Sequence, residues 1–421
     1  MLLVAIMLVT KATDYKPEVA KEEITRFDVF LNNVTLEDIK KGNKSTIYYG
    51  NDIKITNNDL EGFLEKVEIG GRGNSTWNQV KKPFKLKLDG RKNLLDLGKS
   101  KKWVLLANYF DDTHLRNEIA FEFWNMMNDK LIMKEAPVEL YFDGEYEGLY
   151  YLTRKIEISK SMVDLRNLEG AIVELDNINS EEQLCYYTEM GNCLTVTDLV
   201  AEQNKEAVME MVLKKFNDFE KAAQGGDWDE LNDICDIDSM VKYFLISEFS
   251  ANPDAYTSSL FFYVDGEQDK IHVGPAWDFD FAFANQRWIW GNGASNSPER
   301  SLLMKKEAFG FNVYDAMEGQ KQIEPNMNIS RMFYWMIDIP EFREAVSEEV
   351  ERVLMGRRKD LINKIIEKAK IIRDAANRNN EKWERNEYDE EVERLLWWVF
   401  KRYDYIEREY GWQDSMTTYY E

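Results

Sequence analysis

The pattern of apolar residues changes near residue 200, and this change limits the folds that the chain can adopt. Before that point, short apolar runs alternate with turn residues, which is typical of strands. Beyond it, apolar residues recur at helical spacing. Sheet first and helices second is the order of an α+β fold. We therefore expect two lobes, with an antiparallel sheet in the N-lobe and helices in the C-lobe.

Local patterns place several strands and one helix in the first half. Segment 83–88, PFKLKL, alternates apolar and basic residues, which predicts a half-buried strand with a basic outer face. Segments 47–55 and 138–153 each contain two apolar runs around a turn and predict β-hairpins. Helical spacing predicts a helix over 114–128, and the apolar run 170–176 predicts a further strand.

The second half is expected to be helical apart from one hairpin. Amphipathic spacing predicts helices over 207–223 and 237–249 and through most of 340–410. Between them, the apolar segments 259–265 and 270–281 predict a pair of strands around a glycine turn.

Three parts are expected along the chain: a leader or partial signal segment over 1–30, a sheet-rich N-lobe with nucleotide-binding elements over 31–200, and a helical C-lobe over 201–421. Within the leader, the apolar stretch 2–9 is too short to span a bilayer and is either part of a secretory signal or a plain strand. A long surface loop is expected over 286–328. No stretch is long and apolar enough for a transmembrane helix.

Composition excludes several classes of function. The net charge of -23 makes nonspecific nucleic-acid binding unfavourable, so no nucleic-acid partner is expected. The two histidines, His114 and His272, have no further His or Cys at zinc-ligand spacing, which argues against a zinc site. No nucleophile elbow is present either, so proton transfer is expected to fall to carboxylates.

The cysteine count is odd, with Cys185, Cys193 and Cys235. Cys185 and Cys193 are spaced to close a short disulfide loop in an oxidising compartment, or all three are free or buried thiols.

A glycine-rich turn followed by a basic strand is the first candidate for phosphate binding. Glycines at 70, 71 and 73 would let backbone N–H groups approach phosphate oxygens. The polar and basic side chains of this stretch are Arg72, Asn74, Ser75, Lys82, Lys85 and Lys87. The alternative is a plain turn with a solvated strand face, and so short a motif does not decide between them.

Asp254 follows the helix predicted over 237–249 and is a candidate for proton transfer. A carboxylate on such a loop can accept a proton from an attacking hydroxyl, or orient it. The alternative is a turn or helix stop signalled by Pro253.

Asp278 and Asp280 lie at the end of the strand predicted over 270–281 and are candidates for metal binding. Alternation would place both on one strand face, where two like charges are costly unless a cation lies between them. Oxygen ligands without histidine favour Mg²⁺ or Mn²⁺. The alternative is an exposed strand end with both carboxylates in water.

The order of these carboxylates is that of protein kinases, which place a catalytic-loop Asp and a metal-binding Asp before Phe on the two sides of a hairpin. Asp254 and Asp278–Phe279 follow this order. A standard protein kinase is nevertheless excluded, because no HRD motif is present and Asp280 replaces the Gly of DFG.

Six segments together resemble the CotH kinase family, in that family's order, over about residues 67–285. They are RGNSTW, KKPFKLKL, KSKKWVLLANYFDDTHLRN, ELYFDGEYEGLYYLT, NPDAYTSSLFFY and GPAWDFDFAFAN. The resemblance implies an atypical protein-kinase-like fold, binding of ATP with Mg²⁺ or Mn²⁺, and phosphorylation of proteins, including spore-coat proteins.

The resemblance also assigns roles to residues. It matches Asp254 with the family's catalytic Asp and Asp278 with its metal-binding Asp, with Asp280 adjacent. The family's basic strand matches Lys82, Lys85 and Lys87. The helix over 115–127 takes the place of the kinase C helix, so that Glu118 or Glu122 would pair with a lysine of that strand.

We therefore expect an ATP-dependent kinase that acts on Ser or Thr of a protein substrate. The resemblance favours a spore coat, cell surface or secreted location over the cytoplasm. One alternative is a non-catalytic surface or coat interaction protein that keeps the fold. Another is a metal-dependent phosphoesterase or glycosidase with paired carboxylates. The sequence does not predict the oligomeric state.

Overall fold

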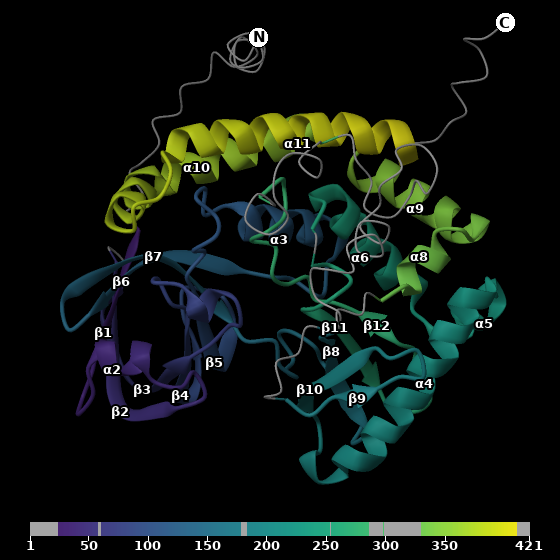
Figure 1. The fold of residues 1–421 in the computed structure, drawn as a ribbon, viewed down its shortest axis with the longest axis horizontal. Coiled ribbons are helices and arrows are strands. Elements are labelled where there is room, and N and C mark those ends of the chain that lie inside the picture. The colour runs from purple at the N-terminus through teal and green to yellow at the C-terminus, as the bar shows by residue number, and fades with distance from the viewer. Residues whose placement is uncertain are drawn as a thin grey trace, which may run out of the picture.

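A computed structural model describes residues 24–57, 60–177, 183–252, 254–285, 298 and 330–410. The described residues form a mixed α+β fold with a β-barrel, a second sheet with helices beside it, and a long helical hairpin that crosses over both (Figure 1). The leader stretch 2–9 and nearly all of the loop expected over 286–328 lie outside the described residues. No described helix is long and apolar enough to cross a membrane.

The barrel is closed by seven strands in the order β1-β2-β3-β4-β5-β7-β6, with β6 parallel to β1 at the closure. The strands are β1 (Thr25–Phe30), β2 (Ile47–Asn57), β3 (Leu60–Gly71), β4 (Phe84–Asn93), β5 (Lys99–Leu106), β6 (Glu135–Phe142) and β7 (Glu145–Arg154). Helix α2 (Leu36–Lys41) follows β1, the short 3-10 helix η1 (Thr76–Asn78) follows β3, and α3 (Arg116–Met127) follows β5.

Alternation in the sequence sets which side chains fill the barrel. Phe84, Leu86 and Leu88 of β4 are buried in the smaller of two apolar cores, whereas Lys87 is exposed, as the strict alternation of 83–88 predicts. Burial of each such side chain contributes roughly 1.5–3 kcal/mol. The apolar spacing of this segment therefore determines which face of β4 carries the lysines.

Segment 47–55 is one strand rather than the predicted hairpin. β2 runs through it, paired with β1 on one side and β3 on the other. The register with β3 shifts between Tyr48 and Asn51, and Gly50 between them has a φ of 78°. Glycine adopts this angle without strain, so the turn residues form a bulge inside a continuing strand.

The second sheet has the order β12-β11-β8-β10-β9. Its strands are β8 (Gly170–Leu175), β9 (Tyr186–Tyr187), β10 (Cys193–Leu199), β11 (Leu260–Asp265) and β12 (His272–Val273). The helices of this half are α4 (Lys205–Gly225), α5 (Trp228–Ile234), α6 (Ile237–Ser250), α8 (Met332–Met336), α9 (Pro340–Val353), α10 (Arg358–Lys382) and α11 (Tyr388–Tyr410), and the 3-10 helix η2 (Glu202–Asn204) precedes α4. The helices predicted over 207–223 and 237–249 are confirmed.

The strand predicted over 270–281 ends at Val273. Gly274 and Pro275 follow, and proline lacks the N–H group that would continue the ladder. Residues 274–283 therefore form an irregular segment. The expectation that strand alternation places Asp278 and Asp280 on one face is wrong.

Helices α10 and α11 form a hairpin that lies along one side of the whole molecule, above the barrel, α3 and α6 (Figure 1). Trp398 of α11 is buried in the larger core, which also contains α3 and α6 side chains. Arg402 of α11 is fully buried, and its guanidinium Nε donates to the carbonyl oxygens of Glu248 and Phe249 at 3.0 and 3.2 Å. The tail therefore fixes the C-terminal end of α6.

Cys185 and Cys193 form a disulfide, whereas Cys235 is a buried thiol. Of the alternatives that the sequence leaves open, the structure has the disulfide. It ties the segment before β9 to the start of β10, at the edge of the second sheet.

Replacing both Cys185 and Cys193 by alanine is expected to lower the free energy of unfolding by about 2–3 kcal/mol. The disulfide closes only a short loop, so its removal raises the entropy of the unfolded chain modestly. Denaturant unfolding of the variant and of the wild type measures the difference. Wild-type protein kept under reductant is the control and should lose the same amount. Equal stability of the oxidised wild type and the variant would contradict the expectation.

Candidate functional site

Asp254 lies in a tight turn directly after α6. The helix ends at Ala251, whose φ of 47° reverses the chain. The side chain of Asn252 accepts from the Asp254 backbone N–H at 3.2 Å, and the Asp254 carbonyl accepts from the N–H of Thr257 at 3.0 Å. These bonds fix the backbone and leave the half-buried carboxylate without a hydrogen bond to another described residue.

Asp278 has a φ of 65°, a left-handed conformation that is uncommon outside glycine. Three bonds hold it there. Asn252 donates to its carbonyl oxygen at 3.3 Å, Ser259 donates to its Oδ2 at 3.3 Å, and the next N–H, of Phe279, donates to Oδ1 of Asn117 at 2.6 Å. Phe279 is fully buried whereas Asp278 is exposed, so a buried aromatic ring anchors the carboxylate.

Asp278 lies close enough to Asp254 and Asp280 for its charge to raise the pKa of both. Burial and the charge of Asp278 raise the pKa of Asp254 to about 7. Burial and the charges of Asp278 and Asp254 raise the pKa of Asp280, which is only 6% exposed, well above its ordinary value. The structure therefore brings together the three carboxylates that the sequence singles out, although no strand alternation aligns them.

Glu174 of β8 belongs to the same acidic cluster and was missed at the sequence level. Burial and the charges of Asp176 and Asp278 raise the pKa of Glu174 to about 8, while Lys155 and Arg72 act in the opposite direction. A usable signal was present, because a glutamate interrupts the apolar run 170–176. From here on, "acidic cluster" means Asp254, Asp278, Asp280 and Glu174.

Arg72 faces the acidic cluster from the barrel. It follows the last residue of β3, and a Cβ on Gly71 would overlap the indole ring of Trp77, so the turn requires glycine there. The Arg72 guanidinium lies 5.9 Å from the ring centroid of Trp277. Burial lowers its pKa, and the charges of Asp278, Glu174 and Asp280 oppose this. Within the described part of the chain it makes no hydrogen bond or ion pair.

A comparison with protein-family models matches residues 69–406 to the model described as CotH kinase protein. The chain belongs to the CotH kinase family. None of the curated proteins compared with it is significantly similar. The match extends beyond the segments that carry the resemblance in sequence, because it includes α9, α10 and most of α11.

The lysines of the basic strand in this CotH family member have different surroundings. Lys82 folds back onto Trp77, where it donates to the carbonyl oxygen and lies 4.7 Å from the ring centroid, and burial and the charge of Lys40 lower its pKa. Lys87 forms an ion pair with Glu68 at 3.0 Å. Neither contacts the acidic cluster.

Lys85 is the strand lysine whose register places it nearest to Arg72. It pairs with Gly70 of β3 and with Val104 of β5. Val104 points out of the barrel into the larger core, and Lys85 lies on the same face of the sheet.

Asn74 and Ser75 are exposed on the turn that follows Arg72. The side-chain oxygen of Asn74 accepts from Lys44 at 2.9 Å, and the side chain of Ser75 does not cap the 3-10 helix that begins after it. Their predicted role in nucleotide binding stays a prediction.

The two glutamates of α3 bind lysines of α10 rather than a lysine of the basic strand. Glu118 lies 2.6 Å from Lys368, and Glu122 lies 2.9 Å from Lys364. The expected pairing with the strand was wrong because lysines of α10, which is remote in sequence, reach both glutamates. No local pattern indicates this contact.

The acidic cluster fits a divalent cation only in part. Among the residues that the structure describes, no three His, Cys, Asp or Glu side chains are grouped so that they could hold a metal by themselves. Mg²⁺ is commonly held by one or two carboxylates together with substrate phosphates and water. A bound cation would oppose the charge of Asp278, which contributes to the raised pKa of both Asp254 and Asp280.

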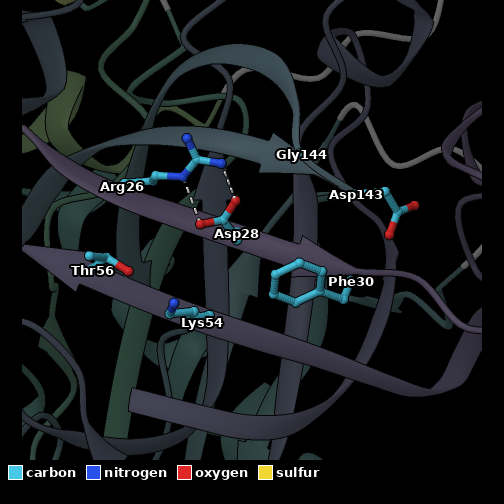
Figure 2. Close-up of a pocket in the computed structure, with 7 residues that line it drawn as sticks. All are labelled: Arg26, Asp28, Phe30, Lys54, Thr56, Asp143 and Gly144. Atoms are coloured by element: carbon cyan, nitrogen blue, oxygen red, sulfur yellow. Dashed lines mark hydrogen bonds and ion pairs between the residues drawn. The ribbon is translucent and has the colours of Figure 1, made fainter. Parts of the chain in front are cut away.

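A separate hollow of about 640 Å³ lies on the outer wall of the barrel. Figure 2 shows its lining from β1, β2 and the turn between β6 and β7, with Arg26 bonded to Asp28 and the ring of Phe30 beside them. None of the predicted site residues lines it. We therefore place the functional site at the acidic cluster.

The pH dependence of stability provides a test of the acidic cluster. Glu174 has a pKa of about 8 in the folded protein against an ordinary glutamate pKa of 4.5, so the folded state holds a proton that the unfolded chain has released. The free energy of unfolding of the wild type should therefore fall as the pH rises from about 4.5 to about 8. Glu174→Gln should gain about 1–2 kcal/mol relative to the wild type between about pH 5 and pH 8, a value reduced for partial solvent screening.

Thermal unfolding at several pH values measures this difference, and the exposed Glu230→Gln on α5 is the matched control. A difference between Glu174→Gln and the wild type that does not change with pH would show that Glu174 is not held in a raised-pKa environment.

Proposed function

We propose that this protein is an ATP-dependent phosphotransferase that acts on Ser or Thr hydroxyls of a protein substrate. The observation that carries the proposal is that the Arg72 guanidinium lies within electrostatic reach of the acidic cluster and has no hydrogen bond or ion pair to another described residue. The guanidinium comes from a glycine turn of the barrel. Of the carboxylates, Glu174 comes from the second sheet, Asp254 from the turn after α6, and Asp278 and Asp280 from the irregular segment after β12. In this proposal the barrel corresponds to a kinase N-lobe, and the second sheet with its helices corresponds to the C-lobe.

The nucleotide would be ATP with Mg²⁺ or Mn²⁺. Bound metal would neutralise charge on the phosphates during transfer. Asp278 and Asp280 are the residues that would hold it, since Asp278 is exposed at the cluster and Asp280 has no hydrogen bond from its carboxylate to another described residue. Arg72 would orient a phosphate oxygen by bidentate hydrogen bonds.

Asp254 would orient the acceptor hydroxyl and take its proton. Its pKa of about 7 makes it a usable base near neutral pH. The same charge repulsion from Asp278 that raises this pKa would be relieved once a cation is bound, so the carboxylate would then be ionised when the hydroxyl is in place. Lys85 is the strand lysine placed best to reach the nucleotide, because its register puts it on the outer face of the barrel close to Arg72.

The disulfide supports a location outside the reducing cytosol, such as a spore coat, the cell surface or the extracellular space. Membership of the CotH kinase family favours a protein substrate, which would lie in the same compartment. The alternative, a non-catalytic coat or surface protein, would keep the fold but would not bind Mg-ATP.

The proposal is tested by incubating the protein with labelled ATP, Mn²⁺ or Mg²⁺ and a Ser-rich acidic protein. Transfer of label to the acceptor is expected, together with thermal stabilisation by ATP and metal. Stabilisation without transfer to any acceptor would favour a binding protein. Absence of both, with an intact fold, would overturn the proposal.

A further inference from the structure

Helix α3 is bonded directly to the segment that carries two of the four carboxylates, 278–280. Oδ1 of Asn117 accepts from the N–H of Phe279 at 2.6 Å, and Nε of Arg116 donates to the carbonyl oxygen of Ala282 at 3.0 Å. Asn117 and Arg116 are 3% and 4% exposed, so water does not replace these bonds easily. The position of the segment therefore depends on the position of α3.

Helix α3 is in turn anchored to α10. Nζ of Lys368 lies 2.6 Å from Glu118 and 3.3 Å from Glu122, and Lys364 lies 2.9 Å from Glu122. The hydroxyl of Tyr151, on β7, donates to the second oxygen of Glu118 at 3.3 Å. The Glu118 side chain is 12% exposed and that of Lys368 is 25% exposed, so solvent screens this ion pair less than it screens a surface pair.

The loop that enters α3 is held by the same hairpin. The side chain of Asn380 donates to the carbonyl oxygen of Asp112 at 3.0 Å, and its Oδ1 lies 2.9 Å from Nε2 of His114. Nε of Arg385 donates to the Asp112 carboxylate at 2.7 Å. Residues on α10 and just beyond it thus fix both the start and the body of α3.

We propose that α10 positions the 278–280 segment through α3. Lys368 of α10 holds α3 by its ion pair with Glu118, and Asn117 of α3 holds the segment by its hydrogen bond from the Phe279 N–H. In standard protein kinases a glutamate of the C helix pairs with a lysine of the N-lobe sheet, and this pair controls whether the site is assembled. Here Glu118 is bound to Lys368 of α10 instead. Lys368, Glu118 and Asn117 are positioning residues. The consequence for metal binding rests on the proposed function, whereas the effect of α10 on the position of the 278–280 segment does not.

The test compares Lys368→Met, Lys368→Arg and Arg378→Met in the full chain. Arg378 is the matched control because it lies on the same helix and forms an ion pair at 2.6 Å, but with Glu139 of β6 instead of α3. Two quantities are measured: backbone hydrogen exchange over residues 276–283, and the affinity for Mn²⁺ alone by titration of free Mn²⁺.

In Lys368→Met, exchange over 276–283 should be about fivefold faster and Mn²⁺ binding about fivefold weaker, which is what a partly buried ion pair supports. Lys368→Arg should restore both quantities, and Arg378→Met should change neither. In Asn117→Leu, the Phe279 amide loses its acceptor, so about tenfold effects are expected. Because this buried substitution also affects folding, the three variants on α10 decide whether the inference holds.

Wild-type exchange over 276–283 in Lys368→Met would overturn the inference and leave the proposed function standing. Faster exchange in Lys368→Met, with neither Mn²⁺ binding nor thermal stabilisation by ATP with metal in the wild type, would overturn the proposed function and support the link from α10 to the segment. Equal acceleration in Arg378→Met would show a general loosening of α10 and would also overturn the inference.

Discussion

Replacing Asp278 by asparagine is expected to remove phosphate transfer and most of the thermal stabilisation by ATP with Mg²⁺ or Mn²⁺. The side chain keeps its size, and its exposed position means that the fold should tolerate the change. A neutral amide is a poor ligand for a divalent cation, so metal and nucleotide would both bind weakly. A loss of at least about 1,000-fold in transfer rate, roughly 4 kcal/mol of transition-state stabilisation, follows if the metal is essential.

The measurement is a pair of assays on the same variant: label transfer from ATP, and the shift in unfolding temperature with ATP and metal. Saturating ligand stabilises by about 2.7 kcal/mol at 100 times its Kd, and this is the stabilisation that should be lost. Asp229→Asn, an exposed change on α5, is the control and should behave as wild type. A full thermal shift in Asp278→Asn would show that Asp278 does not hold the metal.

Replacing Asp254 by asparagine is expected to lower transfer by about 100- to 10,000-fold, the usual contribution of a general base. The thermal shift with ATP and metal should persist, because the carboxylate would touch the acceptor hydroxyl and not the nucleotide. The turn should also persist, since Asn252 and Thr257 bond the backbone of residue 254 and not its side chain.

The two variants should therefore separate: Asp278→Asn loses binding and transfer, and Asp254→Asn loses transfer alone. A second readout is the pH profile. Transfer by the wild type should rise with pH as Asp254 ionises, and the residual activity of Asp254→Asn should lack that step. If Asp254→Asn alone loses the thermal shift, the roles assigned to the two residues are reversed.

Much of the fold could be predicted because its signals are local. The alternation of Phe84, Leu86 and Leu88, the turn at Asp143–Gly144 and the helical spacing of α3, α4 and α6 are each written within a few residues. Prediction was wrong where a glycine in an apolar segment is compatible with more than one backbone structure. Gly50 forms a bulge instead of a turn, and Gly274 with Pro275 ends a strand early.

The candidate site could be predicted in part. Asp278 and Asp280 stood out because two like charges beside apolar residues are costly without a cation, and Asp254 stood out by its loop after a helix and its order relative to Asp278. The structure brings all three within electrostatic reach of one another or of Arg72. Glu174 was missed because one glutamate in an apolar strand does not indicate what it faces.

The sequence by itself indicated strands first and helices second, drew attention to three carboxylates and identified the family. Only the tertiary structure decided the partners of the charged side chains. Lys87 binds Glu68 on the neighbouring strand β3, whereas Glu118 binds Lys368 from a helix 250 residues away. The physical reason is that spacing along a chain sets which face of an element is apolar, whereas an ion pair depends on which elements pack together. In this protein the strand order of the barrel determines the partner of Lys87, and the position of α10 relative to α3 determines the partner of Glu118.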